Sequence, residues 1–235
     1  MNSGLDGTTL DRCIEFELYS NCSTAPVVVS QTVHFGPPFN LQGRALGVML
    51  EVPPGDYQCI SARDPLHTVR SVAPMSIVDG RFHASFTGDP VFGGNWLING
   101  NLDGSSAIDV LDFGLFVDYH LTSQNPDTPC GTTGVNADFN GDGFVDTRDW
   151  QFIADHLLSA DMVSCCGTTA GAESDSVYEI SVAELKATGR GRLTVADLNG
   201  DGWVDQADVA LFGADGFSLK PHRKRSHSTR TLRQK

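Results

Sequence analysis

Two stretches of twelve residues carry oxygen-bearing side chains at the same alternating positions. The stretch that begins at Asp138 and the stretch that begins at Asp197 both have Asp, Asn, Asp, Asp and Asp at positions 1, 3, 5, 9 and 12, with glycine at position 6. In a tightly turning loop, alternate side chains converge on one point, and glycine permits the sharp turn. Such a cage of oxygens suits calcium, which accepts about six to eight of them at irregular angles, better than magnesium, which demands a strict octahedron.

These two loops are the strongest candidates for metal binding, because the backbone carbonyl at position 7 adds one more oxygen to the side chains. We expect calcium ligands at Asp138, Asn140, Asp142, Phe144, Asp146 and Asp149 in one loop and at Asp197, Asn199, Asp201, Trp203, Asp205 and Asp208 in the other. A solvated turn that only caps a helix would need no more than the aspartates at positions 9 and 12. Two complete matches make that simpler interpretation the weaker one.

A third copy of the loop precedes the other two when it is counted back from Asp112 as position 12. Its expected ligands are Asn101, Asp103, Ser105, Ala107, Asp109 and Asp112, with Ala107 contributing its carbonyl oxygen. Asn101 is neutral where aspartate is usual, and Ser106 stands where glycine is usual. We therefore expect the weakest of the three sites here, and a capped turn without metal stays an alternative for this loop.

Each loop is followed by apolar residues with the spacing of one helical face. These residues are Phe113, Phe116, Val117 and Leu121, then Trp150, Ile153, Ala154 and Leu158, then Val209, Phe212 and Phe217. Gly213 and Gly216 are expected to shorten the last of these helices. A fourth, degenerate unit contains the capping box Ser181-x-x-Glu184, but Val177 offers no side-chain oxygen at its position 5, so we expect no metal there.

The loops and their exiting helices resemble dockerins, the calcium-loop modules of bacterial surface assemblies, over residues 97–217. The resemblance implies loop–helix units paired about a pseudo-twofold axis, folding that depends on calcium, and a cohesin-like protein or another cell-surface scaffold as partner. The unit starts at 101, 138, 173 and 197 predict two pairs, the first unit with the second and the third with the fourth.

A calcium sensor of the calmodulin type is disfavoured by the same residues. Such sensors use a Met-rich groove and a glutamate at position 12, whereas this chain has four methionines and aspartate at that position. A constitutive structural or docking role is therefore the better interpretation.

The first part of the chain alternates polar and apolar residues with the period of half-buried strands. The segments 14–18, 48–52 and 82–86 show this alternation, and Asp79-Gly80 is typical of a hairpin turn. Six or seven such strands favour a small antiparallel β-sandwich. The stretches 52–57 (Val-Pro-Pro-Gly-Asp-Tyr) and 66–70 (Leu-His-Thr-Val-Arg) resemble the late strands of transthyretin-like or carboxypeptidase-regulatory-like sandwiches.

The sequence thus predicts an α+β protein of several domains. A flexible N-terminus (1–11) is followed by the β-sandwich (12–92), a first dockerin-like pair of units (93–168), a second pair with a degenerate first half (169–219) and a basic disordered tail (220–235).

Charge is strongly segregated along the chain. The formal net charge is −13, but residues 1–219 carry −20, because 7 of the 16 Lys and Arg residues lie from Lys220 onward, where there is no Asp or Glu. Such an acidic body repels nucleic-acid phosphates and attracts hard cations.

No apolar run approaches the roughly 18 residues of a membrane helix, and the first six residues do not resemble a signal peptide. We expect no nucleic-acid partner, no membrane insertion, and a mature or truncated form of an extracellular or cell-surface protein.

Six cysteines without the spacing of a zinc site indicate disulfides and an oxidising compartment. A cytosolic protein with buried free thiols is the alternative. Cys130 precedes the second loop, and Cys165 and Cys166 follow its helix, so we expect one of that pair to bond Cys130.

No combination of residues outside the loops indicates catalysis. The carboxylates there, such as Glu15, Glu17 and Glu51, lie at solvent-facing positions of predicted strands. His67 has no nucleophile or acid pattern beside it and is interpreted as a surface-strand residue. We therefore expect a non-enzymatic protein.

A carbohydrate-binding accessory module of a polysaccharide-degrading system is the alternative function. Tyr57 or Trp96 could then form the stacking platform for a sugar ring. Trp96 is better explained as packing between the sandwich and the first loop.

Overall fold

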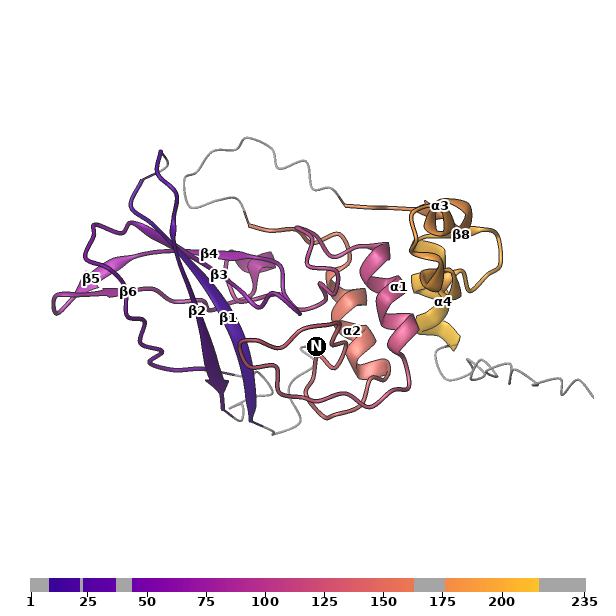
Figure 1. Cartoon of the computed structure of the whole chain (residues 1–235), viewed down its shortest axis with the longest axis horizontal. Coiled ribbons are helices and arrows are strands. Elements are labelled where there is room, and N and C mark those ends of the chain that lie inside the picture. The colour runs from indigo at the N-terminus through magenta and orange to yellow at the C-terminus, as the bar shows by residue number, and fades with distance from the viewer. Residues whose placement is uncertain (1–8, 22, 37–43, 163–175, 216–235) are drawn as a thin grey trace, which may run out of the picture.

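The computed structural model describes residues 9–21, 23–36, 44–162 and 176–215. Within them, an antiparallel sheet forms one end of the molecule and a set of short helices forms the other, so the fold is an α+β mixture (Figure 1). The tail from 220, Cys22, Cys165, Cys166 and Phe217 lie outside the described residues.

The main sheet has four strands in the order β2-β1-β3-β4, and each neighbouring pair is antiparallel. The strands are β1 (Leu10–Tyr19), β2 (Val27–Phe35), β3 (Cys59–Arg63) and β4 (Ser71–Pro74). The alternation of β1 buries Ile14, Phe16 and Leu18 on one face, where they form a core with Ile60 and Ala73. β1 begins at Leu10, inside the segment that was expected to be a flexible N-terminus.

A separate hairpin of β5 (Ser76–Val78) and β6 (Arg81–His83) follows the sheet. Val78 pairs with Arg81, so Asp79-Gly80 is the two-residue turn that the sequence predicted. Both turn residues have positive φ, 49° and 72°, as this turn requires.

Two of the predicted strands are wrong in whole or in part. Residues 48–52 form no strand, and β6 ends at His83 rather than at 86. In the first case, Leu50 and Val52 pack against the core of the sheet while their neighbours are exposed. A segment that lies on a core with one side buried shows the period of a strand without pairing to one.

The helical part contains η1 (Pro90–Phe92), α1 (Val110–Tyr119), α2 (Thr147–His156), α3 (Val182–Ala187), η2 (Gly191–Ala196) and α4 (Gln206–Asp215), with the short strands β7 (Ile180–Ser181) and β8 (Trp203–Val204) between them. Asp109 and Asp146 are the N-caps of α1 and α2, and each forms a capping box with the aspartate three residues later. A shared core of Phe113, Phe116 and Phe212 joins α1 to α4.

The expectation that Gly213 would shorten the last helix is wrong, because α4 has ten residues, as α1 and α2 do. A Cβ atom at Gly213 would lie 2.5 Å from the Cη2 atom of Trp150. The glycine therefore lets α4 approach the indole ring of α2, and packing overrides its weak helix propensity.

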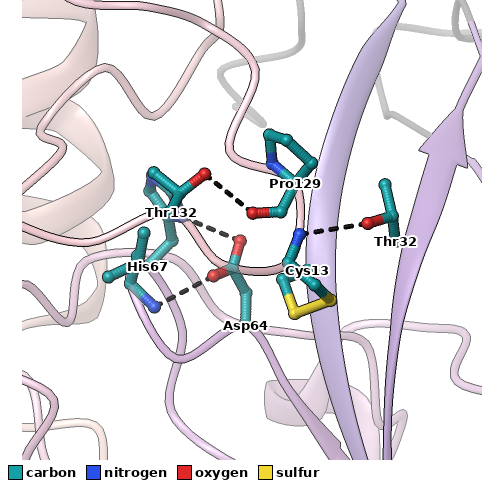
Figure 2. Close-up of a disulfide and its surroundings, with 8 residues drawn as sticks. Cys13, Thr32, Asp64, His67, Pro129 and Thr132 are labelled. Atoms are coloured by element: carbon teal, nitrogen blue, oxygen red, sulfur yellow. Dashed lines mark hydrogen bonds and ion pairs between the residues drawn. A yellow bond between two sulfur atoms is a disulfide. The ribbon is translucent and has the colours of Figure 1, made fainter.

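The sheet and the helical part are joined along β1. Residues 127–130 lie beside β1, with a parallel bridge between Arg12 and Thr128 and with the amide of Cys13 donating to the Thr128 carbonyl (2.8 Å). Cys13 and Cys130 form a disulfide (Figure 2). The expected bond from Cys130 to Cys165 or Cys166 is therefore wrong, because Cys130 lies against β1, which is distant in sequence. None of the described helices is long and apolar enough to cross a membrane.

Candidate metal-binding loops

The three predicted loops share one pattern of hydrogen bonds, which is set by the aspartate at position 12. In the second loop, the Asp149 carboxylate accepts the backbone N–H of Asn140 at position 3 (3.0 Å) and of Asp146 at position 9 (3.0 Å). Asp112 and Asp208 accept the N–H groups of the same two positions in the first and third loops, at 2.8–3.1 Å. The starts at 101, 138 and 197 therefore place equivalent residues at equivalent points of three loops.

The side chain at position 1 folds the first half of each loop. Asp138 accepts the N–H groups of Gly141 and Gly143, both at 2.8 Å, and Asp197 accepts those of Gly200 and Gly202 at 2.8 and 3.1 Å. The side chains at positions 3, 5 and 9 each accept the N–H two residues later, as the pairs Asn140 with Asp142, Asp142 with Phe144, and Asp146 with Arg148 illustrate. The oxygen-bearing side chains at these positions thus hydrogen-bond to the backbone of their own loop.

The first loop departs from this pattern at the residues that the sequence marked as unusual. Asn101 has one side-chain oxygen, which accepts from Gly104, and its amide donates to the Ser105 carbonyl (2.6 Å). The Ser105 hydroxyl donates to the carbonyl of Ala107 (2.9 Å), the backbone oxygen expected to bind metal. The only side-chain oxygen of Asn101 and the carbonyl oxygen of Ala107 therefore both already accept donors from within this loop.

Burial sets the electrostatics of the loops. Asp112, Asp138, Asp149 and Asp208 are fully buried. Burial, with a smaller contribution from Asp103, raises the pKa of Asp112 to about 8, and burial raises the pKa of Asp149 to about 7. The pKa values of Asp138 and Asp208 are raised for the same reason, although backbone N–H groups partly oppose the effect. Buried carboxylates of this kind favour either protonation or a nearby cation.

The donor set of the second and third loops fits a hard cation. Both offer only oxygens, from carboxylates, an asparagine amide and the carbonyl at position 7, on a backbone that the position 1 and position 12 aspartates already fold. Among the described residues, no group of three or more His, Cys, Asp or Glu side chains is arranged to hold a metal ion. At position 5, the carboxylates of Asp142 and Asp201 instead accept the amide of the asparagine at position 3, at 3.1 and 3.0 Å.

The first two units exchange hydrogen bonds reciprocally. The backbone of Ile108, at position 8 of the first loop, bonds to Leu158 and Ser159 beyond α2 at 2.7 and 2.8 Å. The backbone of Val145, at position 8 of the second loop, bonds to Leu121 and Thr122 beyond α1, both at 2.9 Å. Leu121 and Leu158 hold the same position in their units and share a positive φ of 62° and 69°. The two units are therefore bonded to each other through equivalent positions.

The degenerate unit and the third loop are joined by a short two-stranded sheet. Ile180 of β7 pairs with Val204 of β8, which is position 8 of the third loop. In the degenerate unit, Ser181 caps α3 by accepting the N–H of Glu184 (3.1 Å). The amide of Val177 donates to the Asp109 carboxylate of the first loop (2.8 Å), which attaches this second pair to the first.

Several residues considered for other roles are placed differently from their predicted positions. His67 is not on the surface: it is 1% exposed and bonds to Asp64 at 2.8 Å (Figure 2). Tyr57 is buried and donates to the Pro53 carbonyl, so it offers no stacking platform, whereas Trp96 is half-buried against the core of the helical part.

The carboxylates of β1 are not free in solvent either. Glu15 pairs with Arg63 at 2.9 Å and with Arg70 at 3.2 Å, and Glu17 pairs with Arg70 at 2.9 Å. These ion pairs lie on the face of the sheet opposite to its core. The sequence does not predict them, because Arg63 comes to β1 only through the pairing of β1 with β3, and Arg70, just before β4, only through the further pairing of β3 with β4.

No protein-family model, no curated protein and no solved structure matches the chain.

Proposed function

We propose that this chain is a non-enzymatic, extracellular or cell-surface calcium-binding protein. Calcium is held by the loops 138–149 and 197–208 and more weakly by the loop 101–112. The observation that carries the proposal is the hydrogen-bond pattern that recurs in all three loops, because it places equivalent oxygen side chains at equivalent points of each loop and buries the aspartate at position 12. Burying several carboxylates together is costly unless a cation compensates them.

Calcium is favoured over other metals by the chemistry of the ligands. The loops contain no sulfur or imidazole donor, which disfavours zinc and copper. Each has five side-chain donors and a carbonyl on a flexible loop, which suits the irregular coordination of calcium better than the octahedron of magnesium.

In this proposal, the metal has a constitutive role. The units form a dockerin-like pair of pairs that follows the antiparallel sheet, and calcium keeps the pairs folded so that they can dock to a cohesin-like protein or another surface scaffold. The helices that follow the loops are ten residues long, too short to persist alone, and they share one core around Phe113 and Phe212. The disulfide between Cys13 and Cys130 fits an oxidising compartment.

Calorimetric titration with calcium tests the proposal. We expect at least two sites in the wild-type chain. Asp142→Ala and Asp201→Ala should each remove one site, because position 5 lies within the oxygen cage. Asp56→Ala serves as the control, since Asp56 is exposed and lies outside the loops. Fewer than two sites in the folded wild-type protein would overturn the proposal.

A further inference from the structure

Arg12, at the N-terminal end of β1, is a buried cation that reaches into the second loop. Its side chain is 6% exposed. Nη2 donates to the backbone carbonyl of Asp138 at 3.0 Å, and Nη1 donates to the Thr128 hydroxyl at 3.2 Å. Asp138 is position 1 of the second loop, so the guanidinium holds the backbone of a predicted calcium ligand.

The guanidinium is itself held from the opposite side. Nη1 of Arg12 contacts the ring nitrogens of His67. Nδ1 of His67 bonds to the Asp64 carboxylate at 2.8 Å, as Figure 2 shows. Burial alone would raise the pKa of Asp64, but His67 and Arg12 outweigh it and hold the value below its usual range. A carboxylate that stays ionised beside His67 and Arg12 fixes the position of both groups.

The contacts between the sheet and the second loop fall on the first four positions of that loop. Besides Arg12 on Asp138, the His67 ring lies edge-on to Phe139 at 6.0 Å. The side chain of Leu10 fills the space beside Gly141, where a Cβ atom would come within 2.4 Å of it. Asp138 in turn accepts the N–H groups of Gly141 and Gly143. The first half of the loop, with ligand positions 1, 3 and 5, therefore rests on the sheet.

The third loop offers an internal comparison. It has the same ligands and the same hydrogen bonds, but β8 and α4, which carry its second half, lie at the opposite end of the molecule from β1 (Figure 1). A group on β1 can thus act on the second loop without acting on the third.

We propose that Arg12 is a positioning residue for calcium in the second loop. By bonding to the carbonyl of Asp138, Arg12 holds the backbone that carries the ligands at positions 1, 3 and 5. The loop then loses less conformational entropy when calcium binds. The inference rests on the proposed function. Groups that orient metal ligands from outside contribute about 10–100-fold to metal affinity, and we expect an effect of this size at the second loop alone.

Two tryptophans allow the loops to be followed separately. Trp150 directly follows the last ligand of the second loop, and Trp203 is position 7 of the third. Because Trp150 also packs against α4, each loop is followed with the other disabled. Titration with calcium alone of the Trp96→Phe/Asp201→Ala background reports the second loop by fluorescence, and titration of Trp96→Phe/Asp142→Ala reports the third. Arg12→Met should weaken calcium binding at the second loop about 10–100-fold and leave the third unchanged. Arg12→Lys, which keeps the charge but not the fork of donors, should recover part of the loss, and Arg81→Met on exposed β6 is the control.

The outcomes separate the two proposals. If neither loop of the wild type binds calcium, the proposed function fails. If both loops bind and Arg12→Met leaves the second loop unchanged, or tightens it by removing a repelling charge, the positioning role of Arg12 is wrong. Equal weakening of both loops would also overturn it, because that result would show a general loss of structure.

Hydrogen exchange of the wild type keeps the test decisive if Arg12→Met does not fold. Coupling between two sites is reciprocal, so calcium should slow exchange of the Cys13 and Thr128 amides, which bond across the junction beside Arg12. Asp142→Ala should abolish this slowing, whereas Asp201→Ala, which alters the third loop instead, should not. Equal exchange of these amides with calcium and with chelator would overturn the proposal.

Discussion

Asp149 is fully buried, and its carboxylate accepts two backbone N–H groups, yet burial still raises its pKa to about 7. The usual value of an aspartate is about 4, so the metal-free folded state binds a proton more tightly than the unfolded state does. The stability that this proton contributes is full below about pH 4 and is lost as the pH rises through about 7. Calcium requires the ionised form, and so metal binding and proton release are linked.

Calcium binding at the second loop should therefore release about half a proton from Asp149 at pH 7, and the affinity should rise between pH 6 and pH 8. Calorimetry in two buffers with different ionisation enthalpies measures the protons released. To isolate the second loop, the titration uses an Asp103→Ala/Asp201→Ala background, because Asp112 of the first loop also has a raised pKa. Identical binding heats in both buffers at pH 7 would contradict the raised pKa.

The equivalent positions of the loops could be predicted from the sequence because each loop is local: its residues lie within twelve positions, and the same hydrogen bonds recur at the same positions. That these residues bind calcium stays a prediction. Arg12 and His67 could not be predicted in the same way. Arg12 bonds to Asp138 and Thr128, which are far away in the sequence and come close only through the pairing of residues 127–130 with β1. His67 meets Arg12 across 55 positions of the sequence. A histidine in an alternating segment is most simply interpreted as exposed, and nothing in the local sequence shows that Asp64 and Arg12 will satisfy it.

At the scale of elements, α4 shows that packing can determine the length of a helix against the helix propensity of its residues. Its Phe212 contacts Phe113, Phe116 and Trp150 with ring centroids 5.5–5.9 Å apart, so α4 packs against both α1 and α2. Gly213 was interpreted from its helix propensity alone and turned out to be a packing residue. The prediction of a strand over residues 48–52 is wrong for a related reason, since the alternation of this segment arises from burial of one side against the sheet.

Gly213→Ala should therefore lower the melting temperature, although the same change stabilises an open helical position by about 1 kcal/mol. The new methyl group would meet the indole of Trp150, and overpacking typically costs about 1–3 kcal/mol. Thermal unfolding followed by circular dichroism measures the change. Ala210→Gly, at an exposed position of the same helix, reports the propensity effect alone. A rise in the melting temperature of Gly213→Ala would show that α4 does not depend on this close approach.

At the scale of the whole molecule, the sheet and the helical part are less separate than the sequence patterns of the two regions suggest. The sequence predicts a sandwich and a set of loop units as successive domains, and the α+β character and the antiparallel sheet agree with that. However, the segment that leads into the second loop lies along β1 and is bonded to it by Cys13–Cys130. Such a junction joins residues 117 positions apart and leaves no periodic signal in the sequence.

This junction should make the sheet and the helices unfold together. The disulfide limits the separation of the two ends, and Arg12 adds a contact that depends on the folded second loop. In the chain-entropy model, a cross-link over so long a segment contributes up to about 5 kcal/mol. Removing the disulfide takes away the covalent restraint. Removing calcium should open the second loop, because its carboxylates then repel one another, and Arg12 loses its contact with the folded loop.

We therefore expect helical and strand signals of the wild type to melt in one transition, with calcium or with chelator, although chelator lowers the melting temperature. In the double variant Cys13→Ala/Cys130→Ala, chelator should split unfolding into two transitions, with the helical signal lost first. Circular dichroism at helix and strand wavelengths, with calorimetry, separates them. The double variant with calcium is the control and should keep a single transition, because the loaded second loop still carries its contacts with Arg12, His67 and Leu10. If helices and strands of the variant melt together even in chelator, the remaining contacts along β1 join the two ends without help from metal or disulfide.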